Sequence, residues 1–143
     1  MEKMNNILPD TQTFLWSISE PERLSPSVVK LLEDLTVSKF LSAVCAWKIA
    51  IKYSNGKLIL PEPPETFVPN RSRRADFKQL AMTENHALRV TSLPFHHKDP
   101  FDRLLIAQAI VENLPIVTAD PIFKLYPVKI IDAEKYKAGE QIN

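Results

Sequence analysis

Short apolar segments alternate with helix-like segments along this chain, and no tight-turn sequence joins two of the apolar segments directly. With only two glycines in 143 residues, the chain offers few positions at which a hairpin could turn. Strands separated by helices pair in parallel, because a parallel pair needs a long crossover connection. We therefore predict an α/β fold, a three-layer α/β/α sandwich whose central parallel sheet is covered by helices on both faces.

Capping residues and apolar periodicity define the expected elements. We expect strands at residues 7–9, 39–41, 77–82, 115–118 and 128–131. Helices are expected at residues 11–16, 26–35, 43–54, 65–75, 83–92 and 100–112. These elements make a single domain over residues 1–132, followed by a polar C-terminal tail over residues 133–143.

The bulk composition narrows the classes of function without selecting one. Lysine and arginine number 18 against 17 aspartates and glutamates, so nucleic acid could be bound only through a local patch of charge. The lone Cys45 lies in an apolar run, which favours a small buried side chain over a nucleophile and suits a reducing compartment. No apolar run approaches the roughly 20 residues of a membrane helix and the first residues are polar, so we expect a cytoplasmic protein without a membrane segment.

Three aspartates occupy corresponding positions in this pattern. Asp10 and Asp120 follow apolar strands, and Asp102 lies in the first turn of a helix. In a parallel sheet with right-handed crossovers, strand ends and helix starts of this kind lie along one edge. Converging carboxylates repel one another unless a cation neutralises them, and Mg²⁺ or Mn²⁺ is the natural partner for oxygen ligands. The spacing predicts a shared metal site that could activate water for attack on a phosphodiester.

Each acidic residue also has an ordinary structural explanation. Asp99 is most simply the N-cap of the helix that follows, paired with Arg103 four residues later. Asp102 suits the first turn of a helix because of the helix dipole. Asp10 and Asp120 could be turn residues, since aspartate is common where strands lead into helices. One such residue would carry no weight, whereas three at corresponding positions do.

A pair of adjacent histidines precedes the same helix. His96 and His97 look like part of a zinc site, but neither a cysteine nor a third histidine lies near them in the sequence. We expect this pair to order the turn at Asp99 or to contact a substrate.

Several segments occur in the order in which they are found in one protein family: residues 8–16, 42–52, 55–58, 93–109 and 118–120. Together they resemble PIN-domain proteins, specifically the VapC-type ribonuclease toxins of bacterial toxin–antitoxin pairs. The resemblance extends over residues 7–131, and the block from Asp99 to Ala109 is its most specific part. It implies an α/β/α sandwich, a homodimer, and Mg²⁺- or Mn²⁺-dependent cleavage of RNA that a bound small antitoxin protein inhibits.

The resemblance also assigns roles to residues of this chain. Asp10, Asp102 and Asp120 match the acidic metal-site positions of the family, which would make them the ligands of the ion and the catalytic residues. The accessory positions are Thr11, Lys48, Asp99, Arg103 and Thr118.

Lys48 departs from the family pattern. The corresponding helix motif normally reads Trp-Glu-Ile-Ala, whereas this chain reads Trp-Lys-Ile-Ala, and no acidic residue lies between Ser42 and Asn55. At about 4 Å and an effective dielectric constant near 20, each interaction between unit charges is worth about 4 kcal/mol, which competes with a weakly held Mg²⁺. We therefore expect Lys48 to point toward Asp10 and Asp102 and to weaken metal binding and RNA cleavage.

Two functions follow from these features. The first is a metal-dependent endoribonuclease toxin in which a metal-bound water is the nucleophile. The second is a catalytically degenerate PIN domain that binds an antitoxin or RNA. Apolar side chains near the N-terminus favour a homodimer that also binds an antitoxin, unless they are ordinary core residues: Phe14, Leu15, Trp16 and Ile18.

Overall fold

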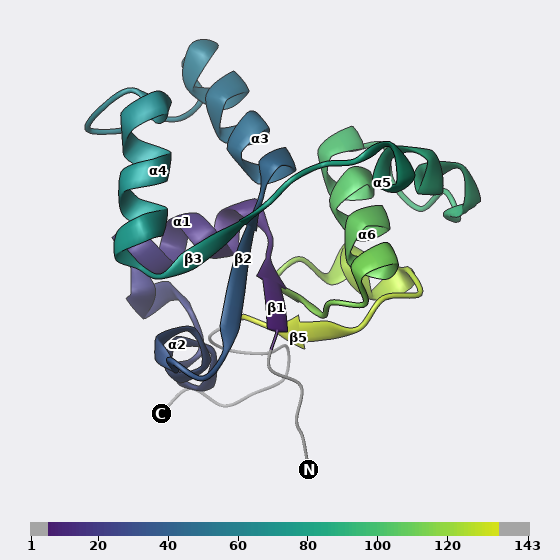
Figure 1. The fold of residues 1–143 in the computed structure, drawn as a ribbon, viewed down its shortest axis with the longest axis horizontal. Coiled ribbons are helices and arrows are strands. Elements are labelled where there is room, and N and C mark those ends of the chain that lie inside the picture. The colour runs from purple at the N-terminus through teal and green to yellow at the C-terminus, as the bar shows by residue number, and fades with distance from the viewer. Residues whose placement is uncertain (1–5, 135–143) are drawn as a thin grey trace.

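Five strands pair in parallel in the order β3-β2-β1-β4-β5 within residues 6–134, the part of the chain that the computed structural model describes. The strands are β1 (Asn6–Pro9), β2 (Ser38–Ser42), β3 (Phe77–Leu80), β4 (Ile116–Thr118) and β5 (Ile130–Asp132). Within the same residues, six α-helices flank this sheet (Figure 1). The predicted α/β/α sandwich with a central parallel sheet is confirmed.

Most of the helices begin where the sequence offers a capping side chain that accepts a backbone N–H. The capping residues are Asp10 for α1 (Thr11–Ser19), Ser25 for α2 (Pro26–Glu33), Ser42 for α3 (Ala43–Ser54), Thr83 for α5 (Glu84–Arg89) and Asp99 for α6 (Pro100–Glu112). The remaining helix, α4 (Pro64–Arg74), begins with a proline, whose fixed φ suits the first helical position. None of the helices between residues 6 and 134 combines the length and the apolar composition that crossing a bilayer requires.

Four helical segments differ from the predicted bounds. Helix α1 continues to Ser19, beyond the predicted end at residue 16, and α4 covers Pro64–Arg74 instead of residues 65–75. Helix α2 ends at Glu33, because the side chain of Asp34 accepts both the backbone N–H and the hydroxyl of Thr36 and turns the chain. The segment expected as one helix over residues 83–92 is α5 followed by the 3-10 turn η2 (Val90–Ser92). Two further 3-10 turns, η1 (Pro21–Arg23) and η3 (Pro121–Leu125), complete the connections.

Neighbouring residues of the central strands point to opposite faces of the sheet, as the pleat of a strand requires. Leu8 and Ile116 are fully buried in the larger core, which includes residues of α3 and α6. Ile7 and Val117 are fully buried in the smaller core, which includes residues of α2. Both faces are therefore covered, which is the usual condition of an all-parallel sheet.

The folded domain extends beyond the predicted boundary at residue 132. Ala133 is fully buried in the smaller core, and its backbone bonds to Thr118 and Ser25. Glu134 forms a bridge with Leu24. These two residues, which we assigned to the tail, belong to the domain; residues 135–143 lie outside the described part of the chain.

The apolar side chains near the N-terminus are core residues. Phe14 is fully buried, and its ring meets that of Phe77 edge to face at 5.1 Å. Leu15, Trp16 and Ile18 are partly buried and pack against the two cores. Phe14 is thus unavailable to a partner chain and the other three are partly covered within one chain, so the homodimer stays a prediction that these side chains support only weakly.

Cys45 in α3 is fully buried, as expected for a small core side chain. Burial raises the pKa of its thiol to about 12. The thiol therefore stays protonated at neutral pH, and a protonated thiol is a poor nucleophile.

Lys39 in β2 is a buried cation that joins two helix ends. Its Nζ atom donates to the carbonyl oxygens of Leu32 and Ala75, each at 2.7 Å, at the C-terminal ends of α2 and α4. Burial lowers the pKa of Lys39, although the charges of Asp76 and Glu33 act in the opposite direction. The ammonium group satisfies carbonyls that no helical N–H can reach, and it faces the negative ends of two helix dipoles.

Replacing Lys39 by methionine should lower the free energy of unfolding by about 2 kcal/mol, because two carbonyl groups lose their partner in a buried setting. Urea denaturation measures this change. Lys30→Met is the matched control, because Lys30 lies exposed on α2 and should change stability by less than about 0.5 kcal/mol. Equal stabilities of the two variants would show that Lys39 does not hold the helix ends.

Candidate active site

Asp10 follows β1 at the C-terminal edge of the sheet, next to Thr118 at the end of β4. Its Oδ1 atom accepts the backbone N–H of Thr13 at 2.9 Å, and its Oδ2 atom accepts the Thr118 hydroxyl at 2.6 Å. Burial raises the pKa of Asp10, although these hydrogen bonds act to lower it. A buried carboxylate is thus held in one orientation at this edge.

Asp99 caps α6, as the sequence predicted. Its Oδ1 atom accepts the backbone N–H groups of Phe101 at 2.9 Å and of Asp102 at 3.2 Å. Burial acts to raise the pKa of Asp99, but the hydrogen bond from the Asp102 N–H and the charge of Lys48 outweigh it, so the pKa is lowered. Asp99 is therefore ionised at neutral pH, and its Oδ2 atom takes no part in the cap.

Lys48 on α3 reaches the start of α6. Its Nζ atom lies 3.3 Å from Asp99 Oδ2 and 3.5 Å from Asp102 Oδ1. Burial acts to lower the pKa of Lys48, but the charges of Asp102 and Asp99 outweigh it, so the pKa is raised and the ammonium group stays charged. The direct partners of Lys48 are Asp99 and Asp102, whereas we expected Asp10 and Asp102.

Asp102 combines burial with several charged neighbours. Burial raises the pKa of Asp102 to about 6; the charges of Asp99 and Asp10 also raise it, while Lys48 and His97 act to lower it. Its Oδ2 atom lies 3.4 Å from Nε2 of His97, on the side of the carboxylate away from Lys48. The interaction with Asp10 shows that the start of α6 lies close to the end of β1.

Asp120 is connected to this group only indirectly in the described structure. Its exposed side chain accepts the backbone N–H of Ile122 at 3.0 Å and caps η3. Its own N–H donates to Thr118 Oγ1 at 3.0 Å, and the same hydroxyl binds Asp10. The carboxylate of Asp120 therefore stabilises a turn, which was the structural alternative to a role as a metal ligand.

The carboxylates in this arrangement do not fit a divalent ion. Within residues 6–134, no group of three or more histidine, cysteine, aspartate or glutamate side chains is placed to hold a metal. Lys48 faces one oxygen of Asp99 and one of Asp102, where a metal ion would need to coordinate. An ammonium group already neutralises part of the charge that would attract Mg²⁺ or Mn²⁺.

Two accessory positions have structural partners of their own. Thr11 acts to lower the pKa of the buried thiol of Cys45, which donates to the carbonyl of Pro9 at 3.9 Å. Arg103 donates to the carbonyl of Pro94 at 2.9 Å and to the Tyr126 hydroxyl at 3.2 Å, rather than to Asp99 as expected.

Sequence reasoning missed Tyr126, which lies just after η3 and belongs to none of the motifs. Its hydroxyl contacts the backbone N–H groups of His96 and His97 at 3.2 Å each and His97 Nδ1 at 2.9 Å. His97 also lies 3.4 Å from Asp102 in the first turn of α6, and the expectation that the histidine pair orders the turn at Asp99 stays a prediction. A single tyrosine on a loop gives no periodic or spacing signal, so no sequence pattern could have identified it.

The sequence was compared with protein families and with individual proteins. The family model described as PIN domain matches residues 7–129. A ribonuclease, VapC16 of Mycobacterium tuberculosis, is 43% identical over 56 residues, which is 39% of this chain and 40% of that protein. The matched segment thus spans less than half of that relative.

Solved structures with a similar fold cover most of the chain. VapBC from Salmonella typhimurium, crystallised bound to DNA, has a TM-score of 0.68 at 17% identity, covering 90% of this chain and 98% of that one. VapBC2 from Rickettsia felis, bound to a DNA fragment from its promoter, has a TM-score of 0.67 at 14% identity, covering 90% and 99%. FitAcB from Neisseria gonorrhoeae has a TM-score of 0.54 at 22% identity, covering 88% and 96%. At these identities the similarity establishes the fold.

The raised pKa of Asp102 predicts a pH-dependent stability difference between the protein and Asp102→Asn. The folded-state pKa of about 6 lies above the ordinary value of 3.8, so the folded protein binds this proton more tightly than the unfolded chain. This contribution to stability is present below pH 4 and is lost as the pH rises through 6. Asp102→Asn lacks this titrating group. When the pH is raised from about 4.5 to about 7, the free energy of unfolding of the protein should therefore fall, relative to that of Asp102→Asn, by on the order of 2 kcal/mol, as measured by urea denaturation. A difference that stays constant between the two pH values would contradict the raised pKa.

Proposed function

The chain belongs to the PIN domain family, and we propose that it is a VapC-type ribonuclease, the toxin of a toxin–antitoxin pair. The observation that carries this proposal is the gathering of acidic groups at the C-terminal edge of the sheet, where Lys48 contacts Asp99 and Asp102 and its charge, like that of Asp102, interacts with Asp10. This edge is where α/β folds bind their ligands. The family match over residues 7–129 and the similarity to VapC16 support RNA as the substrate.

We propose that Asp10, Asp102 and Asp120 are the functional carboxylates. A group with a pKa of about 6 is ionised at neutral pH yet basic enough to accept a proton from an attacking water, which suits Asp102 to general base catalysis. Asp120 would take part only if its side chain left the η3 cap. Lys48 offsets part of the negative charge that would repel an RNA phosphodiester.

Lys48 also favours a second candidate function. Metal-dependent cleavage requires the ammonium group to leave Asp99 and Asp102, which its flexible stem permits at the cost of two charge interactions. We therefore expect cleavage with Mg²⁺ or Mn²⁺ to be slow. The second candidate function is the case in which cleavage is absent altogether, and the protein is a catalytically silent PIN domain that binds an antitoxin or RNA.

We propose a small antitoxin as the protein partner. The similarity to VapBC and FitAcB complexes supports this assignment.

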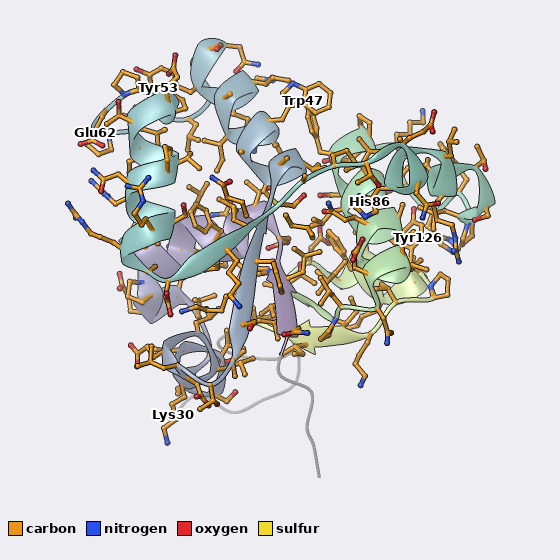
Figure 2. The ribbon with its side chains drawn as sticks, viewed as in Figure 1. Lys30, Trp47, Tyr53, Glu62, His86 and Tyr126 are labelled. Carbon is orange, nitrogen blue, oxygen red and sulfur yellow. The ribbon has the colours of Figure 1, made fainter. Side chains whose placement is uncertain are left out.

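We also propose a homodimer, which two exposed apolar side chains support. Trp47 and Ile51 lie one turn apart on α3 with exposed fractions of 53% and 37%. Trp47 projects from α3 on the side of α6, where its ring meets Phe101 at 4.8 Å (Figure 2). A cytoplasmic location is also proposed, because the lone thiol of Cys45 is buried and unpaired.

RNA cleavage by the purified protein, with and without Mn²⁺, tests the proposed function. A ribonuclease should cut RNA, and Asp102→Asn should reduce the rate by at least about 100-fold, because a general base typically contributes that much. Cleavage that persists unchanged in Asp102→Asn would come from a contaminating nuclease and would reject the site. Absence of cleavage together with binding of RNA or antitoxin would establish the second candidate function.

Lys48→Glu should increase both Mn²⁺ binding and Mn²⁺-dependent cleavage, because it replaces an ammonium group by a fourth carboxylate. Without metal, the variant should melt at a lower temperature than the protein, because the carboxylates then repel one another; Mn²⁺ should reverse this loss. Lys52→Glu is the matched control, since it makes the same charge change at an exposed position one turn away on α3. Equal cleavage rates of the protein and Lys48→Glu, both abolished by Asp102→Asn, would show that Lys48 is tolerated.

A further inference from the structure

The Tyr126 hydroxyl lies at the centre of a partly buried group of polar atoms that includes His97, the neighbour of Asp102. The residue is 4% exposed, and Figure 2 shows it beside α6. Its oxygen lies 3.2 Å from each of three donors: the backbone N–H groups of His96 and His97 and the Nη1 atom of Arg103. The fourth neighbour is the ring nitrogen Nδ1 of His97, at 2.9 Å.

These contacts determine the direction of the hydrogen bond between Tyr126 and His97. A backbone N–H and a guanidinium N–H can only donate, so these three groups share the two lone pairs of the tyrosine oxygen. The hydroxyl proton is left for the remaining neighbour, His97 Nδ1, which must therefore accept it. A neutral imidazole that accepts at Nδ1 carries its own proton at Nε2.

The protonated nitrogen of His97 faces Asp102. Nε2 is buried and has no hydrogen-bond partner within residues 6–134, but Asp102 Oδ2 lies 3.4 Å from it, within the distance of an ion pair. Lys48 lies on the other oxygen of the same carboxylate, 3.5 Å from Oδ1. Each oxygen of Asp102 therefore faces a different nitrogen, Nζ of Lys48 at Oδ1 and Nε2 of His97 at Oδ2.

We propose that Tyr126 and His97 are positioning residues, and that the tyrosine hydroxyl sets the His97 tautomer that orients the Asp102 carboxylate. Ring packing supports this role, because His97 lies against Tyr126 at 5.5 Å and against Phe123 at 6.4 Å between ring centroids, which restrains rotation of the imidazole. The role differs from that of the adjacent His96, which donates its backbone N–H to Tyr126 and packs its exposed ring edge to face on the tyrosine ring at 5.0 Å. The effect on RNA cleavage rests on the proposed function, whereas the tautomer does not.

Nitrogen-15 NMR of the histidine-labelled protein at about pH 8, where an ordinary histidine is neutral, tests the tautomer directly. His97 should show the Nε2–H form alone in the protein and a mixture of both tautomers in Tyr126→Phe, which removes one oxygen and keeps the ring. His97→Gln identifies the His97 signals among those of the three histidines by removing them, and His96→Asn should leave them unchanged. An Nδ1–H form in the protein, or unchanged His97 signals in Tyr126→Phe, would overturn the proposal.

Kinetics of RNA cleavage then separate positioning from a general loss of structure. Tyr126→Phe should lower kcat roughly tenfold with little change in KM, the usual scale for a residue that orients a functional ligand. Tyr53→Phe makes the same change on α3, on the opposite side of the view in Figure 2, and should leave kcat unchanged. His97→Gln, which keeps an N–H donor, should retain more activity than His97→Leu. Equal kcat values for these two His97 variants would contradict a donor role, and a protein that never cleaves RNA would reject the proposed function while the NMR result still decides the tautomer.

Discussion

The parallel pairing of β1 with β4 is the constraint on which the rest of this structure depends. The backbone N–H groups of Leu8 and Asp10 donate to the carbonyls of Pro115 and Val117, each at 3.0 Å, and this register brings Asp10 beside Thr118. A slip of one residue would turn every side chain of β1 to the other face of the sheet. Because both faces of β1 are buried, the two cores fix the register and with it the acidic edge.

Several carboxylates lie at that edge, and the ammonium group of Lys48 offsets part of their mutual repulsion. Lys48 on α3 contacts both Asp99 and Asp102, so it joins α3 to the start of α6 and offsets the repulsion between these two carboxylates. The raised pKa values of Asp10 and Asp102 show that burial of these groups is still unfavourable. Buried, perturbed carboxylates of this kind are typical of functional sites, where stability is given up for chemistry. The fold and the lysine thus have separate effects on this site. The fold brings the carboxylates to one edge of the sheet, and the charge of Lys48 determines how readily a divalent ion can bind between them.

Much of the fold could be predicted because its signals are local. A capping side chain such as Ser42 or Asp99 bonds to an N–H two or three residues away, so the start of a helix depends little on the rest of the chain. The absence of hairpin sequences between strands requires parallel pairing, and parallel pairing in turn predicts that Asp10 and Asp102 lie near one edge. Boundaries were less predictable: Ala133 looks like part of a polar tail, yet a contact with a distant strand buries it.

The sequence by itself determined the α/β class, the parallel sheet, the N-cap at Asp99 and the presence of a lysine where the family motif has an acid. Only the tertiary structure decided which atoms meet. Lys48 contacts Asp102 across 54 positions of sequence, and Tyr126 contacts His97 across 29. Such pairs are set by how α3, α6 and the loop after η3 pack on the sheet. Hydrophobic packing is not directional and leaves no trace in the spacing of polar residues, so the partners of each charged group emerge only when the whole domain is assembled.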